Sequence, residues 1–256
     1  MNQNDESNQT INLFDVTIQN VSLNQAVRQI IQQTGVSGLT PVCFMNAHCV
    51  NIAANNHEYR SVLQQAPLVY ADGVGMQIAA RWMKTPLVDN VNGTDLFPQF
   101  CEALQETNLK LFLLGGAHGV ADELKYNLER QYPKINVVGV HDGFFDENET
   151  PQVIETIRNA KTDILLVAMG VPKQENWITT HAAKTGARVA VGVGGLFNFY
   201  SGRIPRAPKW MRACGLEWLH RMTQEPGRLW KRYLIGNAAF LLRVFIHARN
   251  KNGASN

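Results

Sequence analysis

Residues 109–140 read LKLFLLGGAHGVADELKYNLERQYPKINVVGV. Two short apolar runs, at 109–114 and 135–140, are separated by residues 117–131, where a glycine turn leads into an amphipathic helical pattern. Strands that run in the same direction need a crossover of about this length, which is usually a helix. The segment therefore predicts two parallel strands joined by a helix.

The same alternation of apolar runs and amphipathic segments extends from about residue 11 to residue 193. It predicts a possible edge strand near 11–18 and further strands at 41–45, 68–71, 163–168 and 187–193. It also predicts helices at 22–33, with a serine cap, and at 151–160, with proline in the first turn. We therefore expect residues 1–200 to form an α/β domain, with a doubly wound, mainly parallel, Rossmann-like sheet.

The composition changes after residue 200. Residues 201–208 are rich in Arg, Pro and Gly, and the segment that follows has a helical pattern. Residues 201–256 hold eleven Lys and Arg and two Glu, a net charge of +9, whereas the other 200 residues carry −6. We therefore expect a helical C-terminal appendage that contacts an anionic partner: phospholipid, pyrophosphate or nucleic acid. Its most apolar stretch, 233–242, is far shorter than the roughly 20 residues that span a bilayer.

The compartment and the cofactors follow from what the sequence lacks. The first ten residues, MNQNDESNQT, do not resemble a secretory signal, and four cysteines without a CxxC pair suit a reducing compartment. We expect a cytoplasmic protein. No Asp-x-Asp pair follows a predicted strand, and the histidines at 48, 118 and 141 lack metal-ligand spacing. We therefore expect no metal and no other cofactor.

Polar residues and glycines follow several predicted strands, at the edge where ligands bind in open parallel sheets. Asp72 ends one strand and is either a general base that faces the cleft or a cap of the next helix. Gly115 and Gly116 either bring backbone N–H groups to a phosphate or form a plain tight turn. Lys173 and Gln174, in the first turn of a helix, either face a pyrophosphate leaving group or are solvated.

Six short motifs occur in one order along the chain. They are ADGVG at 71–75, NGTDL at 92–96, GVPKQE at 170–175, GVGGLF at 192–197, RAP at 206–208 and GLEWLHR at 215–221. In this order they resemble the WecG/TagA/CpsF glycosyltransferases of bacterial surface-polymer synthesis, glycosyltransferase family 26. The likeness covers nearly the whole chain.

The resemblance implies inverting transfer of a sugar of the N-acetylmannosamine, mannosaminuronate or hexose type. The donor would be a nucleotide sugar, usually UDP-linked, and the acceptor a polyprenyl-diphosphate-linked sugar at the inner face of the cytoplasmic membrane. Asp72 matches the family's base, whereas Asn46 and Gln174 match residues of the donor pocket. The remaining expected donor contacts are Asn90, Gly115, Gly116, Gly170, Lys173, Phe197 and Asn198. The appendage would bind the anionic membrane surface and complete the site, with Arg206, Arg212, Arg221, Arg228 and Arg232 as contacts of the acceptor diphosphate.

Two positions depart from the family pattern. Asn90 stands where members commonly have Arg, which removes a cation that would hold the pyrophosphate. Asn198 stands where many members have Asp, which alters a nucleotide contact. Both changes concern the identity of the donor rather than the class of reaction.

An alternative interpretation is a nucleotide-binding or single-stranded nucleic-acid-binding module without transferase activity. Basic residues of the appendage alternate with Trp210, Trp218 and Trp230, as in proteins that stack bases on aromatic rings. Binding of a nucleic acid would not explain the carboxylate of Asp72 at the edge of the sheet. We therefore expect no nucleic-acid partner. The sequence indicates no oligomeric state.

Overall fold

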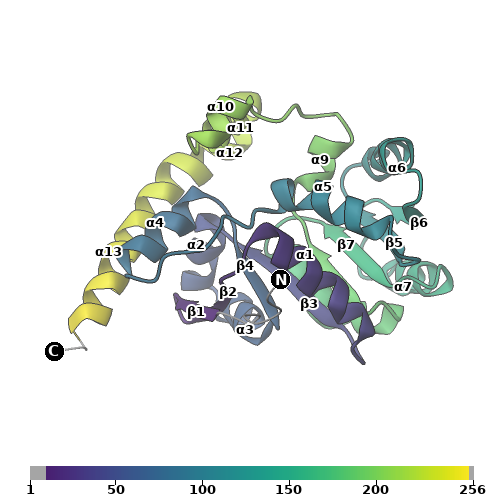
Figure 1. Ribbon diagram of the computed structural model, residues 1–256, viewed down its shortest axis with the longest axis horizontal. Coiled ribbons are helices and arrows are strands. Elements are labelled where there is room, and N and C mark those ends of the chain that lie inside the picture. Colours follow the sequence, from purple (N-terminus) through teal and green to yellow (C-terminus); the bar gives the residue numbers. More distant parts are fainter. Residues whose placement is uncertain (1–9, 254–256) are drawn as a thin grey trace, which may run out of the picture.

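A computed structural model of the chain describes residues 10–253, and its centre is a six-stranded sheet (Figure 1). The strand order is β4-β3-β8-β7-β5-β6, and all neighbouring pairs are parallel. The strands are β3 (Thr40–Met45), β4 (Leu68–Ala71), β5 (Lys110–Gly115), β6 (Asn136–His141), β7 (Ile164–Ala168) and β8 (Val189–Gly192). The predicted α/β, Rossmann-like fold is confirmed, and the predicted ends of these strands lie within two residues of the observed ones.

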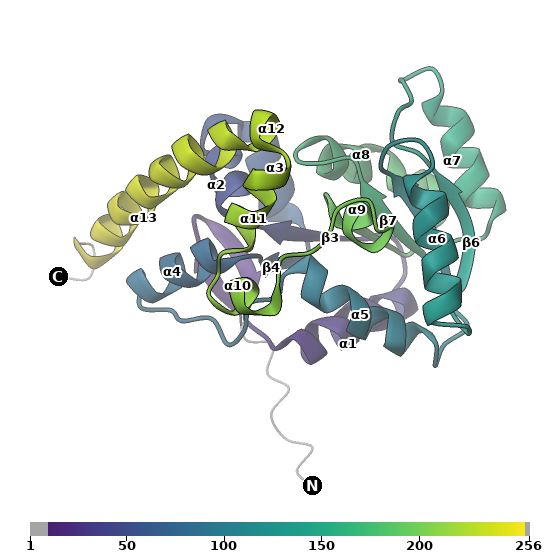
Figure 2. The ribbon, with the colours of Figure 1, turned by 90° about the horizontal axis from the view of Figure 1, so that it is seen from above.

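Helices cover both faces of the sheet (Figures 1 and 2). They are α1 (Leu23–Gln32), α2 (Ala47–Asn55), α3 (His57–Gln65), α4 (Val74–Trp82), α5 (Gly93–Leu104), α6 (Val120–Gln131), α7 (Thr150–Asn159) and α8 (Lys173–His181), with 3₁₀ turns at Gln33–Gly35 and Ala182–Thr185.

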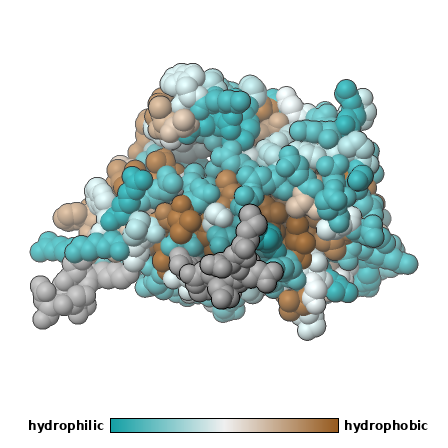
Figure 3. All heavy atoms as spheres, in the orientation of Figure 1, coloured by the Kyte–Doolittle hydropathy of each residue, from teal (hydrophilic) through white to brown (hydrophobic). Residues whose placement is uncertain are grey.

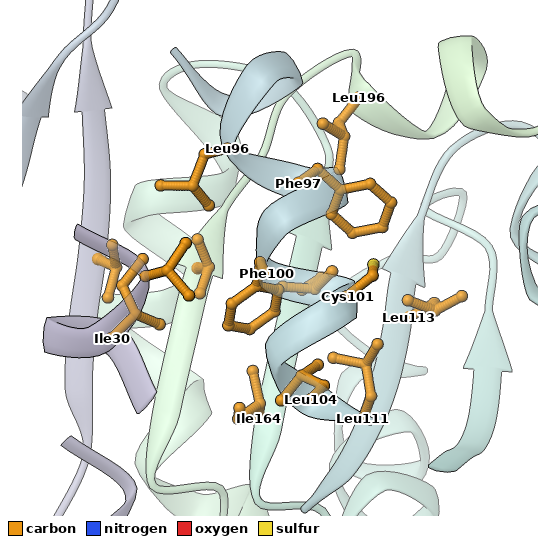
Figure 4. Packing of buried hydrophobic residues seen from close by; sticks show 14 of the residues in the cluster. Ile30, Leu96, Phe97, Phe100, Cys101, Leu104, Leu111, Leu113, Ile164 and Leu196 are labelled. Atoms are coloured by element: carbon orange, nitrogen blue, oxygen red, sulfur yellow. The ribbon is translucent and has the colours of Figure 1, made fainter. Parts of the chain in front are cut away.

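Strand β5 shows why the sheet needs cover on both sides. Side chains alternate between the faces of a strand. Leu111 and Leu113 lie in an apolar cluster with residues of α1, α5 and α6, whereas Phe112 and Leu114 lie in another with residues of α7 and α8. Figure 4 shows the first cluster, in which Phe100 of α5 lies between the sheet and the helix layer. An apolar run without polar alternation is therefore buried on both faces.

Local signals fix the helix starts. The Ser22 side chain accepts a hydrogen bond from the Gln25 backbone N–H, and the Gln25 side chain accepts one from the Ser22 backbone, which makes a capping box at α1. Pro151 lies in the first turn of α7. Both helices were predicted. The helix predicted from residue 117 begins later, at Val120, because Gly119 adopts a φ of +79° and ends the turn before it.

A separate hairpin precedes the sheet in the sequence, with strands β1 (Thr10–Leu13) and β2 (Val16–Gln19), so the predicted edge strand near 11–18 is wrong. Phe14 and Asp15 adopt φ angles of 55° and 62° and reverse the chain in a two-residue turn. In one continuous strand, Leu13 and Val16 would face opposite sides. The turn pairs them instead, and both are buried in one cluster with residues of α2, α3 and α4.

The predicted helical appendage follows α9 (Leu196–Tyr200). Its helices are α10 (Lys209–Ala213), α11 (Glu217–Gln224), α12 (Pro226–Trp230) and α13 (Gly236–Gly253), and a π-helical turn, Lys231–Ile235, joins the last two. The helices pass over the carboxyl ends of the strands, and α13 then runs along α2 and α4 (Figures 1 and 2). Phe240 and Val244 of α13 are buried in the cluster that also holds the hairpin.

Parts of both predicted regions fall outside the described range: residues 1–9 of the region 1–200, and residues 254–256 of the appendage. Within residues 10–253, no helix has the length and hydropathy needed to cross a bilayer.

Candidate active site

A cleft of about 730 Å³ lies where β3, β4, β7 and β8 end. The predicted site residues that line it from the sheet side are Asn46, Asp72, Gly116, Gly170, Lys173, Gln174 and Asn198. The appendage contributes Arg221, Arg228 and Arg232. The fold therefore brings the predicted base, the glycine turns and three of the five predicted arginines to one place.

Asp72 follows β4 and lies beside Asn46, which follows the neighbouring strand β3. The Asn46 Nδ2 donates a hydrogen bond to Asp72 Oδ2 at 3.1 Å. The Asn46 Oδ1 accepts from the backbone N–H groups of His48 and Cys49 at the start of α2, so the amide has one orientation. The N-cap of α4 is Gly73, and Asp72 makes no hydrogen bond to that helix within the described range. The interpretation of Asp72 as a helix cap is therefore wrong.

The electrostatics of the cleft favour a strong base and an anionic ligand. Burial raises the pKa of Asp72 above its ordinary value, while the hydrogen bond from Asn46 and the charge of Arg232 oppose this rise. Burial and the same arginine lower the pKa of His48 to about 4. His48 is therefore neutral at pH 7, and the positive charge at the cleft comes from Lys173 and the arginines.

The appendage arginines keep unused hydrogen-bond donors. Arg221 lies against Gly195, where a side chain would collide with the guanidinium group. Arg228 is paired with Glu225 at 2.9 Å. The Nε atoms of Arg221 and Arg232 are buried and have no hydrogen-bond acceptor in the described part of the chain. Buried donors without acceptors are rare, and a diphosphate would supply the missing oxygens.

Residues 11–254 match the sequence model of the glycosyl transferase WecG/TagA/CpsF family. The chain belongs to this family. Curated relatives in Staphylococcus aureus strains MW2, MRSA252 and NCTC 8325 are each 35% identical over 188 residues, which are 73% of this chain and 71% of each relative. All three are named N-acetylglucosaminyldiphosphoundecaprenol N-acetyl-beta-D-mannosaminyltransferase. The resemblance seen in the motifs is confirmed. The protein is a glycosyltransferase, and the alternative of a binding module without transferase activity is wrong.

Gln174 of this glycosyltransferase joins two strand ends. Its Oε1 accepts from the Gly170 N–H at 3.2 Å and from the Gly194 N–H at 2.9 Å, in the turns after β7 and β8. Its Nε2 donates to Glu175 Oε1 at 2.8 Å. Glu175 is almost fully buried, and burial raises its pKa to about 7. Glu175 was not predicted as a site residue, because nothing in GVPKQE shows that this position faces inward.

Lys173 and Gly116 line the cleft but are partly used by the protein. The Lys173 Nζ donates to the Gly143 carbonyl at 3.4 Å and lies 5.7 Å from the centre of the Phe145 ring. The Gly116 N–H donates to the Ala168 carbonyl at 2.9 Å. Its backbone N–H is therefore not free for a phosphate, although the turn still shapes the cleft wall.

Three predicted donor contacts lie outside the cleft. Asn90 accepts a hydrogen bond from the Gly73 N–H at 2.7 Å and so supports the turn after Asp72. Gly115 packs against β7, where an added Cβ would lie 2.5 Å from a carbonyl oxygen. Phe197 points into the apolar core, as Figure 4 shows, and is 1% exposed. Its neighbour Asn198 lines the cleft instead, because successive residues of α9 face different sides.

Arg206 and Arg212 also lie outside the cleft. Arg206 donates to Asp95 Oδ1 at 2.8 Å, to Glu217 Oε1 at 3.3 Å and to the Thr94 carbonyl at 3.2 Å. Arg212 donates to the same Asp95 oxygen at 3.3 Å. The two arginines are thus paired with protein carboxylates and attach the appendage to the start of α5. We call these contacts the Asp95 anchor. They correct the prediction that both arginines face the acceptor.

Several cleft residues were not predicted as contacts of a substrate, although Thr94 and Gly194 lie in two of the quoted motifs. They are Phe44, His48, Thr94, Gly194, Phe199 and Leu229. Phe199 is the most informative of them, because the Arg221 guanidinium lies 5.3 Å from the centre of its ring. An aromatic residue beside a strand end resembles any core residue until its cationic partner, over twenty residues away, is placed.

A metal site is not evident in the described side chains, which contain no group of three or more His, Cys, Asp or Glu suited to hold an ion. His118 Nδ1 lies 3.4 Å from Asp142 Oδ2, and the histidine is exposed. Metal independence stays a prediction.

Proposed function

We propose that this enzyme transfers a sugar, with inversion, from a UDP-linked nucleotide sugar to a polyprenyl-diphosphate-linked acceptor in bacterial surface polysaccharide synthesis. The S. aureus relatives are named as N-acetyl-mannosaminyl transferases that act on N-acetylglucosaminyl-diphosphoundecaprenol. We therefore expect an N-acetylmannosamine-type donor, ahead of mannosaminuronate and hexose donors. The observation that carries the proposal is the Asp72–Asn46 pair in a cleft that arginines of the appendage also line.

Asp72 is the proposed general base. Its carboxylate takes the proton of the acceptor hydroxyl, the hydroxyl oxygen bonds to the anomeric carbon, and the bond to the nucleoside diphosphate breaks on the opposite face. One displacement of this kind inverts the configuration. The hydrogen bond from Asn46 occupies Oδ2 and so leaves Oδ1 for the hydroxyl. The raised pKa strengthens the base, since a carboxylate with a higher pKa holds a proton more firmly.

The charge that develops on the leaving group needs cations or N–H donors. Lys173 is the first residue of α8 and lines the cleft, so its ammonium and the helix start serve a departing diphosphate. Arg221, Arg228 and Arg232 come from the appendage side, which we assign to the acceptor diphosphate. Guanidinium groups suit this task because they bind phosphate oxygens in pairs.

We also propose that residues 201–256 act as one unit that holds the enzyme on the inner face of the cytoplasmic membrane. Exposed apolar side chains follow one another along its last helices: Trp230, Leu234, Ile235, Leu241, Leu242, Phe245 and Ile246. We call them the apolar ridge, and in Figure 3 tan and brown surface lies among teal surface along the left side of the molecule, where α13 runs. The net charge of +9 adds attraction to anionic lipid, at about 1 kcal/mol for each basic residue close to the surface.

A donor screen tests the proposed reaction. The full chain is incubated with UDP-linked sugars and a short, water-soluble acceptor that carries the diphosphate-linked sugar, and release of UDP is measured. We expect acceptor-dependent release with UDP-N-acetylmannosamine and an inverted anomeric centre in the product by NMR. Asp72→Asn, which keeps the size and removes the base, is the matched control. A product with retained configuration, or release that does not depend on Asp72, would refute the proposed mechanism.

A further inference from the structure

A second cavity, of about 290 Å³, lies between the hairpin, α2 and α13. We call it the hairpin cavity. Phe14, Val50 and Ile246 contribute to its apolar wall, and Arg60, Arg243 and His247 contribute polar atoms. None of these residues lines the cleft, so the reaction proposed above gives the cavity no task.

The two arginines of the hairpin cavity are held in place but are not neutralised. The Arg60 Nε and Nη2 donate to the carbonyls of Ala53 and Ala54, near the end of α2, at 2.9 and 3.3 Å. The Arg243 Nε donates to Asn51 Oδ1 at 3.2 Å. Asp15 also lines the cavity, but neither guanidinium forms an ion pair with it or with any other carboxylate in residues 10–253.

The remaining donors of these arginines point to an anion. Within the described range, both Nη groups of Arg243 and the Nη1 of Arg60 have no acceptor. A guanidinium that is fixed at Nε and free at its other nitrogens is preorganised for phosphate oxygens, since less side-chain freedom is lost on binding. His247 adds a third polar group beside them.

The apolar wall and the position of the cavity identify the kind of anion. Ile246 belongs both to the cavity wall and to the apolar ridge, and it is 50% exposed. The cavity therefore opens beside the surface that would lie in the bilayer interface. We propose that the hairpin cavity binds the headgroup phosphate of an anionic phospholipid, with its glycerol and first acyl carbons against the apolar wall. The inference rests on the membrane contact proposed above.

Such a site would do more than attract the protein to charge. It fixes the rotation of α13 on the membrane, and the same chain of helices carries Arg232 in the cleft. Diffuse attraction depends only on the number of charges near the surface, whereas a site depends on where they are. The experiment separates these two cases.

The test compares arginines that carry equal charge. Vesicles that contain phosphatidylglycerol and phosphatidylcholine are titrated with the full chain at fixed ionic strength, for the parent, Arg243→Gln and Arg249→Gln. Arg249 is exposed on the same helix and does not line the cavity. Arg249→Gln should weaken binding about fivefold, the loss of one basic residue near an anionic surface. Arg243→Gln should weaken it by more than about twentyfold, because the bidentate contact is also lost.

A second variant leaves the charge unchanged. Ala54→Leu places a larger side chain in the cavity wall and should weaken vesicle binding as Arg243→Gln does. Melting temperatures within a few degrees of the parent show that each variant is folded. Equal losses for Arg243→Gln and Arg249→Gln, or normal binding by Ala54→Leu, would overturn the proposal and leave only diffuse attraction.

Soluble ligands distinguish the sources of the phosphate. Dihexanoyl phosphatidylglycerol below its micelle concentration should bind the parent at least tenfold more tightly than inorganic phosphate does, and Arg243→Gln should abolish the difference. Equal affinity for both would overturn the assignment to a lipid. Transfer to the soluble acceptor should be unchanged in all three variants. Absence of transfer in a parent that binds vesicles would refute the proposed function and leave this site standing.

Discussion

Asp95→Asn tests whether one carboxylate holds the appendage against the core. Asp95 Oδ1 accepts from Arg206 at 2.8 Å and from Arg212 at 3.3 Å. Burial alone would raise the pKa of Asp95, but the hydrogen bonds from Asn92 and Arg206 outweigh it and lower the pKa. The asparagine keeps the shape and one acceptor oxygen but removes the charge that both arginines share.

The expected loss of docking free energy follows from the exposure of the Asp95 side chain. The Asp95 side chain is 36% exposed, so solvent screens both pairs, and about 0.5–1 kcal/mol for each is a fair value. A loss of about 1–2 kcal/mol changes the ratio of docked to undocked appendage by a factor of about 5–30. Arg221, Arg228 and Arg232 line the cleft in the docked arrangement. We therefore expect kcat/KM for the soluble acceptor to fall by up to that factor, with faster proteolysis within residues 201–208.

Glu123→Gln is the matched control. It breaks the exposed ion pair between Glu123 Oε2 of α6 and Arg203 Nε, which are 2.7 Å apart. Arg203 lies in the segment that joins α9 to the appendage helices, and the Asp95 anchor stays intact. Its kcat/KM and its rate of proteolysis within residues 201–208 should equal those of the parent. The reasoning fails if Asp95→Asn keeps the parental kcat/KM, or if both variants lose activity equally. The difference in kcat/KM between the parent and Asp95→Asn should shrink as pH falls through the lowered pKa of Asp95, since protonation then removes the same charge in the parent.

Three further predictions concern the cleft. Asp72→Asn should lower kcat by about 10²–10⁴ at an unchanged melting temperature, because an amide cannot accept the hydroxyl proton; turnover within a few-fold of the parent would leave Asp72 without a catalytic role. EDTA should leave transfer intact, and activity that is lost in EDTA and restored by Mg²⁺ or Mn²⁺ would reveal a missed ligand, with Asp142 the first to test. Folded Glu175 keeps its proton up to about pH 7 but loses it near its ordinary pKa when unfolded, so its contribution to stability should fall by on the order of 3 kcal/mol as pH rises through that window. Glu175→Gln should remove this slope, and denaturation midpoints that depend on pH alike in parent and variant would contradict it.

The sheet and part of the cleft were predictable because they depend on rules that act along the chain. Parallel strands bury both faces, so their apolar runs are continuous and easy to locate. Ligands meet the carboxyl ends of such strands, which predicted that Asp72 and the other polar residues after the strands face one cleft, whereas Asn46 was assigned to the donor pocket by the family resemblance. The hairpin was not predicted because its turn lacks the usual local signal. Its turn is Phe14-Asp15, two residues without glycine or asparagine, and the usual signal for positive φ was therefore absent.

The arginines show where sequence reasoning stops. Composition revealed the positive charge of the appendage but not the partner of each guanidinium. Arg206 and Arg221 look equivalent in the sequence, yet the first pairs with Asp95, more than a hundred residues away, and the second lines the cleft. Only the packing of the appendage on α5 decides between them. A charge count therefore predicts that an anion binds nearby, and it leaves open which cations bind it.

The predicted boundary at residue 200 remains a prediction, and the packing of α13 determines how it can be tested. The Phe240 ring is 2% exposed and lies 3.3 Å from the point where a Cβ on Gly75 would stand. Removing one buried phenylalanine typically costs about 3–5 kcal/mol, so a chain that ends at residue 200 loses core as well as arginines. Inactivity of that chain would not separate a lid from a folding defect. Gly75 lies three residues after Asp72 in the motif ADGVG, and so the helix that follows the base is itself packed against the appendage. Point variants of the Asp95 anchor keep the contact between Phe240 and Gly75, and so they test only whether docking of the appendage completes the active site.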